Sequence, residues 1–453
     1  MTNDKVSEIA ARIERLPLTS WQVKARLIVG IATFFDAFDV LAIGYALPAI
    51  VTAWAVKPQN IGVIISAGFA GQLVGAFFFG WLAERIGRLR AIIATVLVYG
   101  IFSFCCGASW SYLSLVVFRV IQGFGLGGEV PIAASYINEI TKAKGRGKFV
   151  LLYELVFSIG NMTAALLSYW IVPRFGWRWL LIIGGLPALV AIYLRWGLPE
   201  SPRWLAGRGR DEEAEKAMAT IERQVKKAYR AELPEPAPIR LATEAKRTRV
   251  MELLSGIYLK RTIVVWIIWF SAYLTTYGMM TWLPSLYRTV YKLPLDKSLL
   301  YTILTQSAGF VGSILAADVM IDKIGRRGLI TINFFLGGAF LFALWYGGAS
   351  TAIQVCILAT GAYFFIGPIS LSLYVYTPEL YPTRMRALGS SIASAWLRLA
   401  SIIGPIMVGM VIAHYNKVAW AFLFFGIVAL IAGCVTLLFG TETKGEILEK
   451  ISP

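Results

Sequence analysis

The chain contains 453 residues, of which 57% are hydrophobic and 15% are charged, and its mean hydropathy is +0.66. Soluble proteins usually carry about 25% charged residues, so this composition excludes an ordinary soluble protein and favours a membrane protein. The net charge of +17 would by itself suit a nucleic-acid-binding protein. The basic residues gather in loops between apolar segments, however, and we expect no nucleic-acid partner.

Apolar segments recur along the whole chain at a length that suits membrane-spanning helices. About 20 residues suffice for a helix to cross the hydrocarbon of a bilayer, and twelve segments meet that length. They are residues 26–52, 61–83, 91–110, 112–137, 149–172, 179–198, 262–284, 298–320, 328–347, 352–377, 388–413 and 418–440. The sequence therefore predicts an all-α membrane protein with twelve transmembrane helices in two six-helix bundles.

A polar, charge-rich segment divides these spans into two equal groups. We predict an N-terminal bundle over residues 1–198, a cytoplasmic linker with short helices over 199–261, and a C-terminal bundle over 262–453. The short loops on the side of the N-terminus hold more lysine and arginine than the loops on the other side. That bias predicts that both termini lie in the cytoplasm.

Charged side chains inside the first group of spans are candidates for function, because burying charge in hydrocarbon is costly. The first span contains Asp36 and Asp39, and the fourth contains Arg119 and Glu129. Counted from the outer ends of their helices, Asp39 lies roughly 16 Å deep and Arg119 roughly 10 Å deep, so the two side chains can meet. A carboxylate that alternately pairs with arginine and takes a proton is a plausible coupling device. A static buried ion pair is the alternative.

A short motif follows the second span and recurs after the eighth. Residues 84–88 (ERIGR) match residues 322–326 (DKIGR), and Glu139 recurs as Glu379 at nearly the same displacement. Such repetition indicates two equivalent halves, which is how secondary transporters are built. Charged residues near these helix ends are expected to form salt bridges that hold one conformation and break in another. They are Glu84, Arg85, Arg88, Glu139, Arg146, Glu154, Asp322, Arg326, Glu379 and Arg386.

Aromatic and amide side chains offer a candidate ligand site. Trp269, Tyr273 and Tyr277 recur at helical spacing along one face of the seventh span, where packing is the alternative to ligand binding. Gln306 in the eighth span and Asn161 in the fifth need hydrogen-bond partners in the middle of the membrane, which favours a ligand-binding role. The single histidine and the four cysteines show no metal-ligand spacing, so we expect no metal, no cofactor and no enzymatic activity.

One arginine, Arg398, lies near the middle of the eleventh span, and no acid shares that helix. A guanidinium group binds a carboxylate through two parallel hydrogen bonds. An anionic substrate would therefore satisfy this side chain. A buried ion pair with Asp318 or another acid is the alternative.

Three motifs resemble those of the major facilitator superfamily, and the resemblance covers essentially the whole chain. Residues 80–90 (GWLAERIGRLR) resemble its signature loop between helices 2 and 3, with Glu84 where aspartate is usual. Residues 119–123 (RVIQG) resemble its helix 4 signature. Residues 199–205 (PESPRWL) follow the sixth span, as in the arm that contains sugar porters and organic-ion transporters. The resemblance implies the fold of this superfamily and transport by alternating access.

Within that arm, the details disfavour a sugar. Sugar porters carry a pair of glutamines and an asparagine on helix 7, whereas residues 269–275 (WFSAYLT) contain none. Asp39 and Arg119 match the helix 1 acid and helix 4 arginine of proton-coupled sugar porters, which implies proton symport. Asp36 with Asp39 resembles the acid pair of aromatic-acid/proton symporters and bacterial niacin transporters. Arg398 is similar to the helix 11 arginine of organic-anion transporters.

The resemblance therefore implies proton-coupled symport of a small aromatic monocarboxylate, such as nicotinate or a hydroxybenzoate, across a bacterial inner membrane. We expect Arg398 to hold the carboxylate, the helix 7 aromatics the ring and Gln306 a ring substituent. Asp39 would carry the proton, with Arg119 setting its proton affinity. The expected partners are the organic anion, protons and the lipid bilayer, with the protein a monomer. Two alternatives stay open: an exporter of organic cations or drugs that uses Asp36 or Asp39, and a non-transporting receptor-like relative.

Overall fold

The structure is a computed structural model, and it describes residues 2–17, 19–141, 146–189, 191, 197–229, 231–236, 250–316, 321–347, 349–415 and 417–444. Every regular element within those ranges is a helix. A backbone that lies in hydrocarbon must satisfy its own hydrogen bonds, and a helix does so within one segment. Eleven of the described helices are long and apolar enough to cross a membrane, which confirms the predicted all-α membrane fold.

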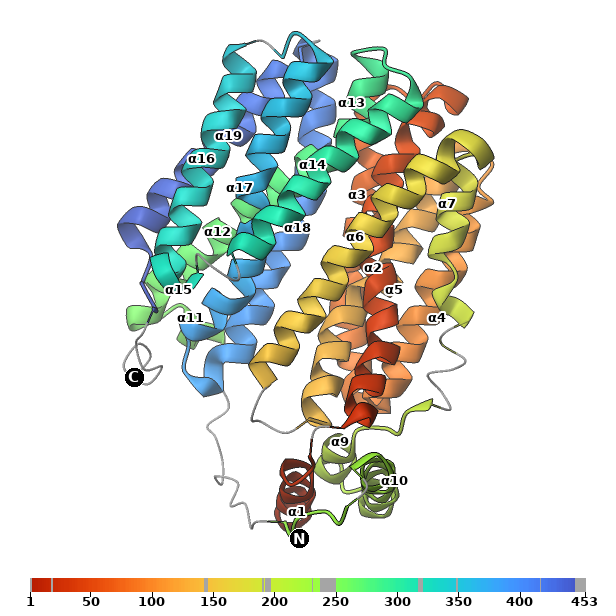
Figure 1. The fold of residues 1–453 in the computed structure, drawn as a ribbon, viewed down its shortest axis with the longest axis vertical. Helices are drawn as coiled ribbons and strands as arrows, with labels where there is room; N and C mark the ends of the chain where they lie inside the picture. The colour runs from red at the N-terminus through yellow and green to blue at the C-terminus, as the bar shows by residue number, and fades with distance from the viewer. Residues whose placement is uncertain are drawn as a thin grey trace.

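The first half contains five long helices and one shorter apolar helix. They are α2 (Ser20–Trp54), α3 (Pro58–Ile86), α4 (Arg88–Gly107), α5 (Tyr112–Glu139), α6 (Arg146–Phe175) and α7 (Trp177–Gly184). The apolar segment that begins with α7 extends to Leu189, and residues 190 and 192–196 of the predicted sixth span lie outside the described residues. Figure 1 shows these helices as one bundle, coloured from red to yellow.

The second half forms the other bundle. Its helices are α12 (Gly256–Met280), α13 (Leu283–Thr289), α14 (Leu295–Leu315), α15 (Ile321–Ile324), α16 (Arg326–Tyr346), α17 (Ala352–Glu379), α18 (Thr383–Tyr415) and α19 (Ala419–Phe439). The predicted seventh span is interrupted, because α12 ends at Met280 and a separate short helix, α13, carries Pro284 in its first turn. Proline lacks the N–H that a continuing helix needs, but it is well tolerated at a helix start.

Glycine allows α3 and α5 to pack closely. A Cβ atom added to Gly123 would lie 1.9 Å from the carbonyl oxygen of Gly68, and one added to Gly71 would lie 2.0 Å from that of Val120. Helices in a membrane approach this closely only where small residues line the contact. The glycines therefore hold α5, which carries Arg119, directly against α3.

The two halves meet toward one end of the molecule. We name the end where α3 leads into α4 the inner end, and the end where α2 leads into α3 the outer end. Ser66 on α3 donates a hydrogen bond of 2.6 Å to the carbonyl oxygen of Ile402 on α18. A Cβ atom on Gly44 of α2 would lie 3.1 Å from the backbone of Thr281. These residues stand in the outer parts of their helices, and Figure 1 shows the bundles close together beside α13 and farther apart at the inner end.

A small group of helices packs beneath the first half at the inner end (Figure 1). It consists of α1 (Thr2–Glu14), α9 (Pro202–Gly207) and α10 (Asp211–Tyr229), and the linker also forms the short α11 (Val250–Leu253). Arg12 on α1 pairs with Glu215 at 2.7 Å and with Glu222 at 2.6 Å, both on α10. Ile9 and Ile13 are fully buried at the same contact. The linker is thus fastened to the N-terminal helix, and α9 also contacts α3 directly, because Trp204 Nε1 donates a hydrogen bond of 3.3 Å to the carbonyl oxygen of Glu84.

Candidate functional site

The α2–α5 contact contains a closed group of three polar side chains, Asp39, Arg119 and Gln122. Arg119 Nη1 lies 2.8 Å from Asp39 Oδ2 and donates a hydrogen bond of 2.7 Å to Gln122 Oε1. Gln122 Nε2 donates a hydrogen bond of 2.6 Å to Asp39 Oδ1. All three side chains are buried. A buried ion pair is stabilised when its remaining polar atoms are also bonded. Gln122 supplies such a contact to both partners, although Arg119 Nε has no hydrogen-bond partner.

Gln122 was given no role by the sequence, although it stands one helical turn from Arg119 and within the helix 4 motif. Two glycines also shape the group. A Cβ atom on Gly68 would lie 2.6 Å from Arg119 Nη2, and one on Gly184 would lie 3.3 Å from Asp39 Oδ1. The missing side chains leave room for the guanidinium and the carboxylate to sit against the backbones of α3 and α7.

Asp36 lies one turn inward of Asp39 on the same helix, yet its surroundings differ. Its side chain is 6% exposed, and Oδ1 is buried without a hydrogen-bond partner. An unpaired buried carboxyl oxygen is costly, so native structures retain one mainly where a ligand, ion or proton meets it. The two predicted acids therefore occupy different environments. Both carboxylate oxygens of Asp39 accept a hydrogen bond, whereas Oδ1 of Asp36 has no partner.

Arg398 reaches from α18 of the second half to α5 of the first. Its Nη2 donates a hydrogen bond of 3.2 Å to the carbonyl oxygen of Gly127, and Nη1 donates one of 3.4 Å to that of Ser394. Its Nε has no partner. Within the described residues no carboxylate forms an ion pair with Arg398, although its charge interacts with that of Asp36. Asp318, the alternative partner considered for it, lies outside the described residues.

The predicted aromatic stripe forms a stack on α12. Tyr273 lies over Trp269 with ring centroids 5.6 Å apart and over Tyr277 with centroids 5.7 Å apart. Trp269 is 1% exposed, and its Nε1 donates a hydrogen bond of 2.8 Å to the hydroxyl of Thr377. Tyr277 instead packs against Phe69 of the first half, with ring centroids 5.1 Å apart. It also lies near enough to Arg398 to interact with the charge of that side chain. Trp269 is thus fixed within the second half, and Tyr277 faces the junction.

The two predicted amides lie on helices that meet across the junction. Ser307 on α14 contacts the sulfur of Met162 on α6 at 3.9 Å, which brings their sequence neighbours Gln306 and Asn161 to the same region. Gln306 Oε1 and Asn161 Oδ1 are both buried without a hydrogen-bond partner. Two unpaired amide oxygens can accept hydrogen bonds from a ligand.

At the inner end of the first half, predicted salt-bridge residues form a network within that half. Arg88 pairs with Glu84 at 2.7 Å and with Glu139 at 3.0 Å. Glu200, for which no role was predicted, accepts a hydrogen bond of 3.0 Å from the backbone N–H of Leu89 at the start of α4. A carboxylate at a helix N-terminus interacts favourably with the helix dipole.

The second half repeats this network. Arg326 pairs with Glu379 at 3.3 Å, and Glu442 accepts a hydrogen bond of 3.0 Å from the backbone N–H of Arg326 at the start of α16. Glu442 was also missed, because its contact is with a backbone group far away in the sequence. These ion pairs lie within each half, so their proposed role in a conformational change stays a prediction.

The other predicted salt-bridge residues have different surroundings. Arg85 lies over the ring of Trp81, 4.3 Å from its centroid, and is not paired with an acid among the described residues. Arg386 Nε is buried without a partner. The side chains of Arg146, Glu154 and Asp322 lie outside the described residues.

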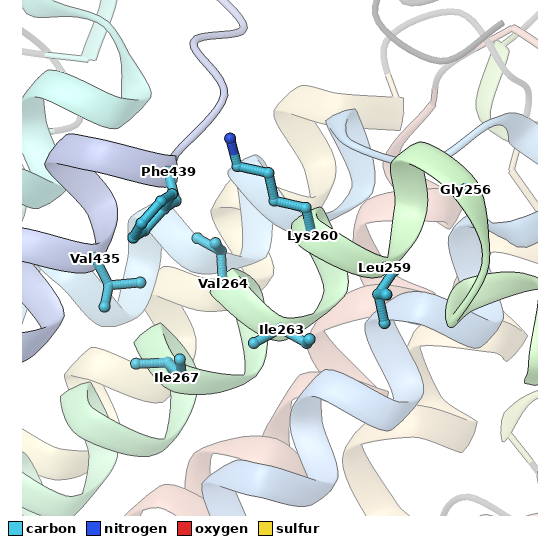
Figure 2. A pocket seen from close by; sticks show the side chains of 8 residues that line it. All are labelled: Gly256, Leu259, Lys260, Ile263, Val264, Ile267, Val435 and Phe439. Carbon is cyan, nitrogen blue, oxygen red and sulfur yellow. The ribbon is translucent and has the colours of Figure 1, made fainter.

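A pocket of about 450 Å³ lies away from these groups, between α12 and α19 (Figure 2). Its lining is apolar except for Lys260, whose Nζ lies 5.3 Å from the centroid of the Phe439 ring. Leu259, Ile263 and Phe439 of this pocket are exposed. Exposed apolar side chains on a membrane-spanning helix face lipid, so this pocket is separate from the polar junction between the halves.

Comparison with known proteins gives concordant matches over nearly the whole chain. The family model described as "Sugar (and other) transporter" matches residues 31–453. The chain is 34% identical to the niacin transporter of Acinetobacter baylyi over 98% of this chain and 99% of that protein. It is 28% identical to the 4-hydroxybenzoate transporter of Pseudomonas aeruginosa over 92% of this chain and 91% of that protein.

A solved structure has the same fold. The xylose transporter of E. coli in a partially occluded inward open conformation matches with a TM-score of 0.72 and 19% identity. The match covers 95% of this chain and 100% of that one. At this identity the likeness concerns the fold alone, and it agrees with the two-bundle arrangement described above.

Proposed function

The chain belongs to the Sugar (and other) transporter family of the major facilitator superfamily, and from that premise we propose that it carries a small aromatic monocarboxylate together with protons. Membership of the family makes it an integral membrane secondary transporter and not an enzyme. Nicotinate and hydroxybenzoates are the proposed substrates, because relatives named for niacin and for 4-hydroxybenzoate align with almost the whole chain.

The observation that carries the choice of an anion is the state of Arg398. Its guanidinium group stands where the two halves meet, and within the described residues it forms no ion pair with a carboxylate. The two carbonyl groups that it contacts carry only partial charges. A substrate carboxylate would supply a full negative charge and a two-pronged hydrogen bond in their place.

The surrounding side chains suit an aromatic acid. Tyr277 lies near Arg398, and Tyr273 stacks on Tyr277. Aromatic rings attract one another beyond the burial of their surface. The unpaired oxygens of Gln306 and Asn161 would accept hydrogen bonds from a ring hydroxyl or a protonated ring nitrogen. A sugar would instead need several donors and acceptors around the whole ring.

The proposed proton site is the group formed by Asp39, Arg119 and Gln122. A proton on Asp39 would remove the charge that holds Arg119 at 2.8 Å, and it would free the α2–α5 contact to change. A ligand or proton shifts a conformational equilibrium only through different affinities for the two states. Co-transport of a proton with a monoanion also removes the opposition of an inside-negative membrane potential.

We place the inner end in the cytoplasm, so that both termini are cytoplasmic, and we place the protein in a bacterial inner membrane. The bias of basic residues toward the inner loops supports this orientation. Because Ser66 contacts Ile402 and Gly44 approaches Thr281 near the outer end, the structure in this orientation is closed to the outside. These contacts support the proposal that the structure represents a stage of alternating access that is closed to the outside.

The test uses purified protein and labelled nicotinate, with Arg398→Gln as the variant. We expect the variant to bind nicotinate about thirtyfold more weakly or worse, because a charge-assisted contact to a desolvated carboxylate is lost. Arg223→Gln, which removes an exposed arginine of α10, is the matched control and should bind as the wild type does. Unchanged affinity in Arg398→Gln would show that this arginine does not hold the substrate.

A further inference from the structure

Glu129 on α5 is a buried acid that the proposed mechanism does not use. Its side chain is fully buried, and Oε1 accepts a hydrogen bond of 3.0 Å from the hydroxyl of Thr33 on α2. Its Oε2 is buried without a hydrogen-bond partner. In the described part of the chain it forms no ion pair with lysine or arginine. A carboxylate without a cation is among the costliest groups to bury, and such a group exchanges its charge for a proton instead.

The position of Glu129 continues the line of acids toward the inner end. Thr33, Asp36 and Asp39 are spaced three residues apart and therefore lie on one face of α2, about 4.5 Å apart along its axis. Because α2 and α5 run in opposite directions, Arg119 meets the outer member of this line and Glu129 meets the inner member. Asp36 stands between them with its own unpaired oxygen.

Other charged or titratable groups surround Glu129 on several helices. Asp36 on α2 and Tyr99 on α4 interact with the charge of Glu129, and farther away on the facing elements lie Asp39 on α2, Arg119 on α5 itself and Arg398 on α18. Tyr99 donates its hydroxyl to the carbonyl oxygen of Ala32 at 3.2 Å, next to Thr33. Arg398 binds the carbonyl oxygen of Gly127, two residues before Glu129. The acid thus lies at the junction between the proposed proton site and the proposed anion site.

We infer that Glu129 is a second proton-binding residue, which receives the transported proton from Asp39 by way of Asp36 and releases it toward the inner end. The inference rests on the proposed function. Thr33 takes part as a relay, because a hydroxyl donates one hydrogen bond and accepts others. It accepts a proton from Asp36 while it gives its own to Glu129 Oε1, so that one O–H bond breaks for each one that forms. The net result is one proton moved inward along α2.

The experiment separates proton movement from substrate movement in proteoliposomes. Counterflow, the exchange of labelled for unlabelled nicotinate, requires no net proton transfer. A pH-sensitive dye trapped in the lumen reports the protons that enter with nicotinate. We expect Glu129→Gln, which resembles the protonated acid, to retain counterflow within about twofold and to slow acidification by about tenfold or more, as for a lost proton-transfer group.

Matched variants make the outcome specific. Glu129→Asp keeps a carboxyl group and should restore part of the acidification. Thr33→Val, which keeps the shape of the relay residue but has no hydroxyl, should also slow it. Glu212→Gln removes an exposed acid of α10 and should change neither measurement. Acidification at the wild-type rate in Glu129→Gln would overturn the inference, as would equal loss of counterflow and acidification. If the wild type takes up nicotinate without acidification, the proposed coupling itself fails.

Discussion

The two halves of the molecule are alike at the inner end and different in the middle of the membrane. Glu200 in the first half and Glu442 in the second each accept a backbone N–H at the start of a helix. In the middle, the first half carries the acids, with Asp39 paired to Arg119 and with unpaired oxygens on Asp36 and Glu129, whereas the second half carries a cation and an amide, Arg398 and Gln306. The repeated parts therefore serve the fold that both halves share. The parts that differ are where proton and substrate chemistry should be sought.

The largest expected effect breaks the enclosed group of the first half. Arg119→Leu leaves Asp39 buried without its cation, and we expect the free energy of unfolding to fall by about 3–5 kcal/mol. Thermal unfolding of the purified protein measures this loss. Adding Asp39→Asn to the same variant should recover much of the stability but no proton coupling. If Arg119→Leu is as stable as the wild type, the ion pair does not hold α2 to α5.

A smaller effect is expected at the residue that completes the group. Gln122→Leu removes the donor to Asp39 Oδ1 and the acceptor for Arg119, which should cost about 1–3 kcal/mol through an unsatisfied buried carboxylate oxygen. In the second half, Gln306→Leu removes an oxygen that is already unpaired. Because the Gln306 side chain also forms a hydrogen bond with Tyr363, the substitution should cost some stability, but less than Gln122→Leu, while weakening nicotinate binding. Equal destabilisation by the two substitutions would remove the contrast between the halves.

The equivalence of the inner networks can be tested directly. Glu200→Gln and Glu442→Gln each remove a negative charge at a helix start, and each should lower the unfolding free energy by about 1 kcal/mol. Because the two acids make the same kind of contact, the two losses should agree within experimental error. A loss confined to one variant would show that the repeated loops do not have the same role.

The smallest expected effect concerns the N-terminal helix. The hydrogen bond from Arg12 lowers the pKa of Glu215. Burial raises the pKa of Glu222, but hydrogen bonds from Arg12 and Arg15 outweigh it and keep that pKa below its usual value. A lowered carboxyl pKa stabilises the folded contact above the unfolded pKa of 4.5, and this stability is lost as pH falls through the folded pKa. We therefore expect α1 to stay docked near neutral pH and to loosen in acid below 4.5.

Spin labels on α1 and α10 measure that docking as a distance across the pH range. Glu222→Gln should weaken the docking at neutral pH and reduce the acid-induced change. A separation that does not depend on pH in the wild type would show that apolar contacts at Ile9 and Ile13 suffice.

Hydropathy and helix geometry predicted much of this arrangement. The spans follow from apolar length, and the contact between Asp39 and Arg119 follows from their similar depths in the bilayer. Depth in the bilayer could not identify Gln122 as a partner of Asp39. Which face of α5 meets α2 depends on how α5 packs against α3 through Gly68 and Gly123. The repeated motif at residues 84–88 and 322–326 predicted that the inner loops of the two halves correspond to each other.

Other features were hidden for identifiable reasons. Glu200 and Glu442 bind backbone N–H groups, which every residue but proline carries, so no side-chain pattern marks their partners. The break between α12 and α13 falls inside a continuous apolar run, where Pro284 was the available signal. Within the described residues, Arg398 has no carboxylate partner. This could not be predicted from the sequence of one helix, because the surroundings of Arg398 depend on how several helices are arranged.

The central claim is that a substrate carboxylate and a proton move together, and it is tested most directly by comparing nicotinate with nicotinamide. Nicotinamide keeps the ring but lacks the negative charge that Arg398 is proposed to bind. In wild-type proteoliposomes with a pH-sensitive dye inside, nicotinate should be taken up and acidify the lumen, whereas nicotinamide should do neither. Uptake of nicotinate without acidification, or equal uptake of both compounds, would contradict the account.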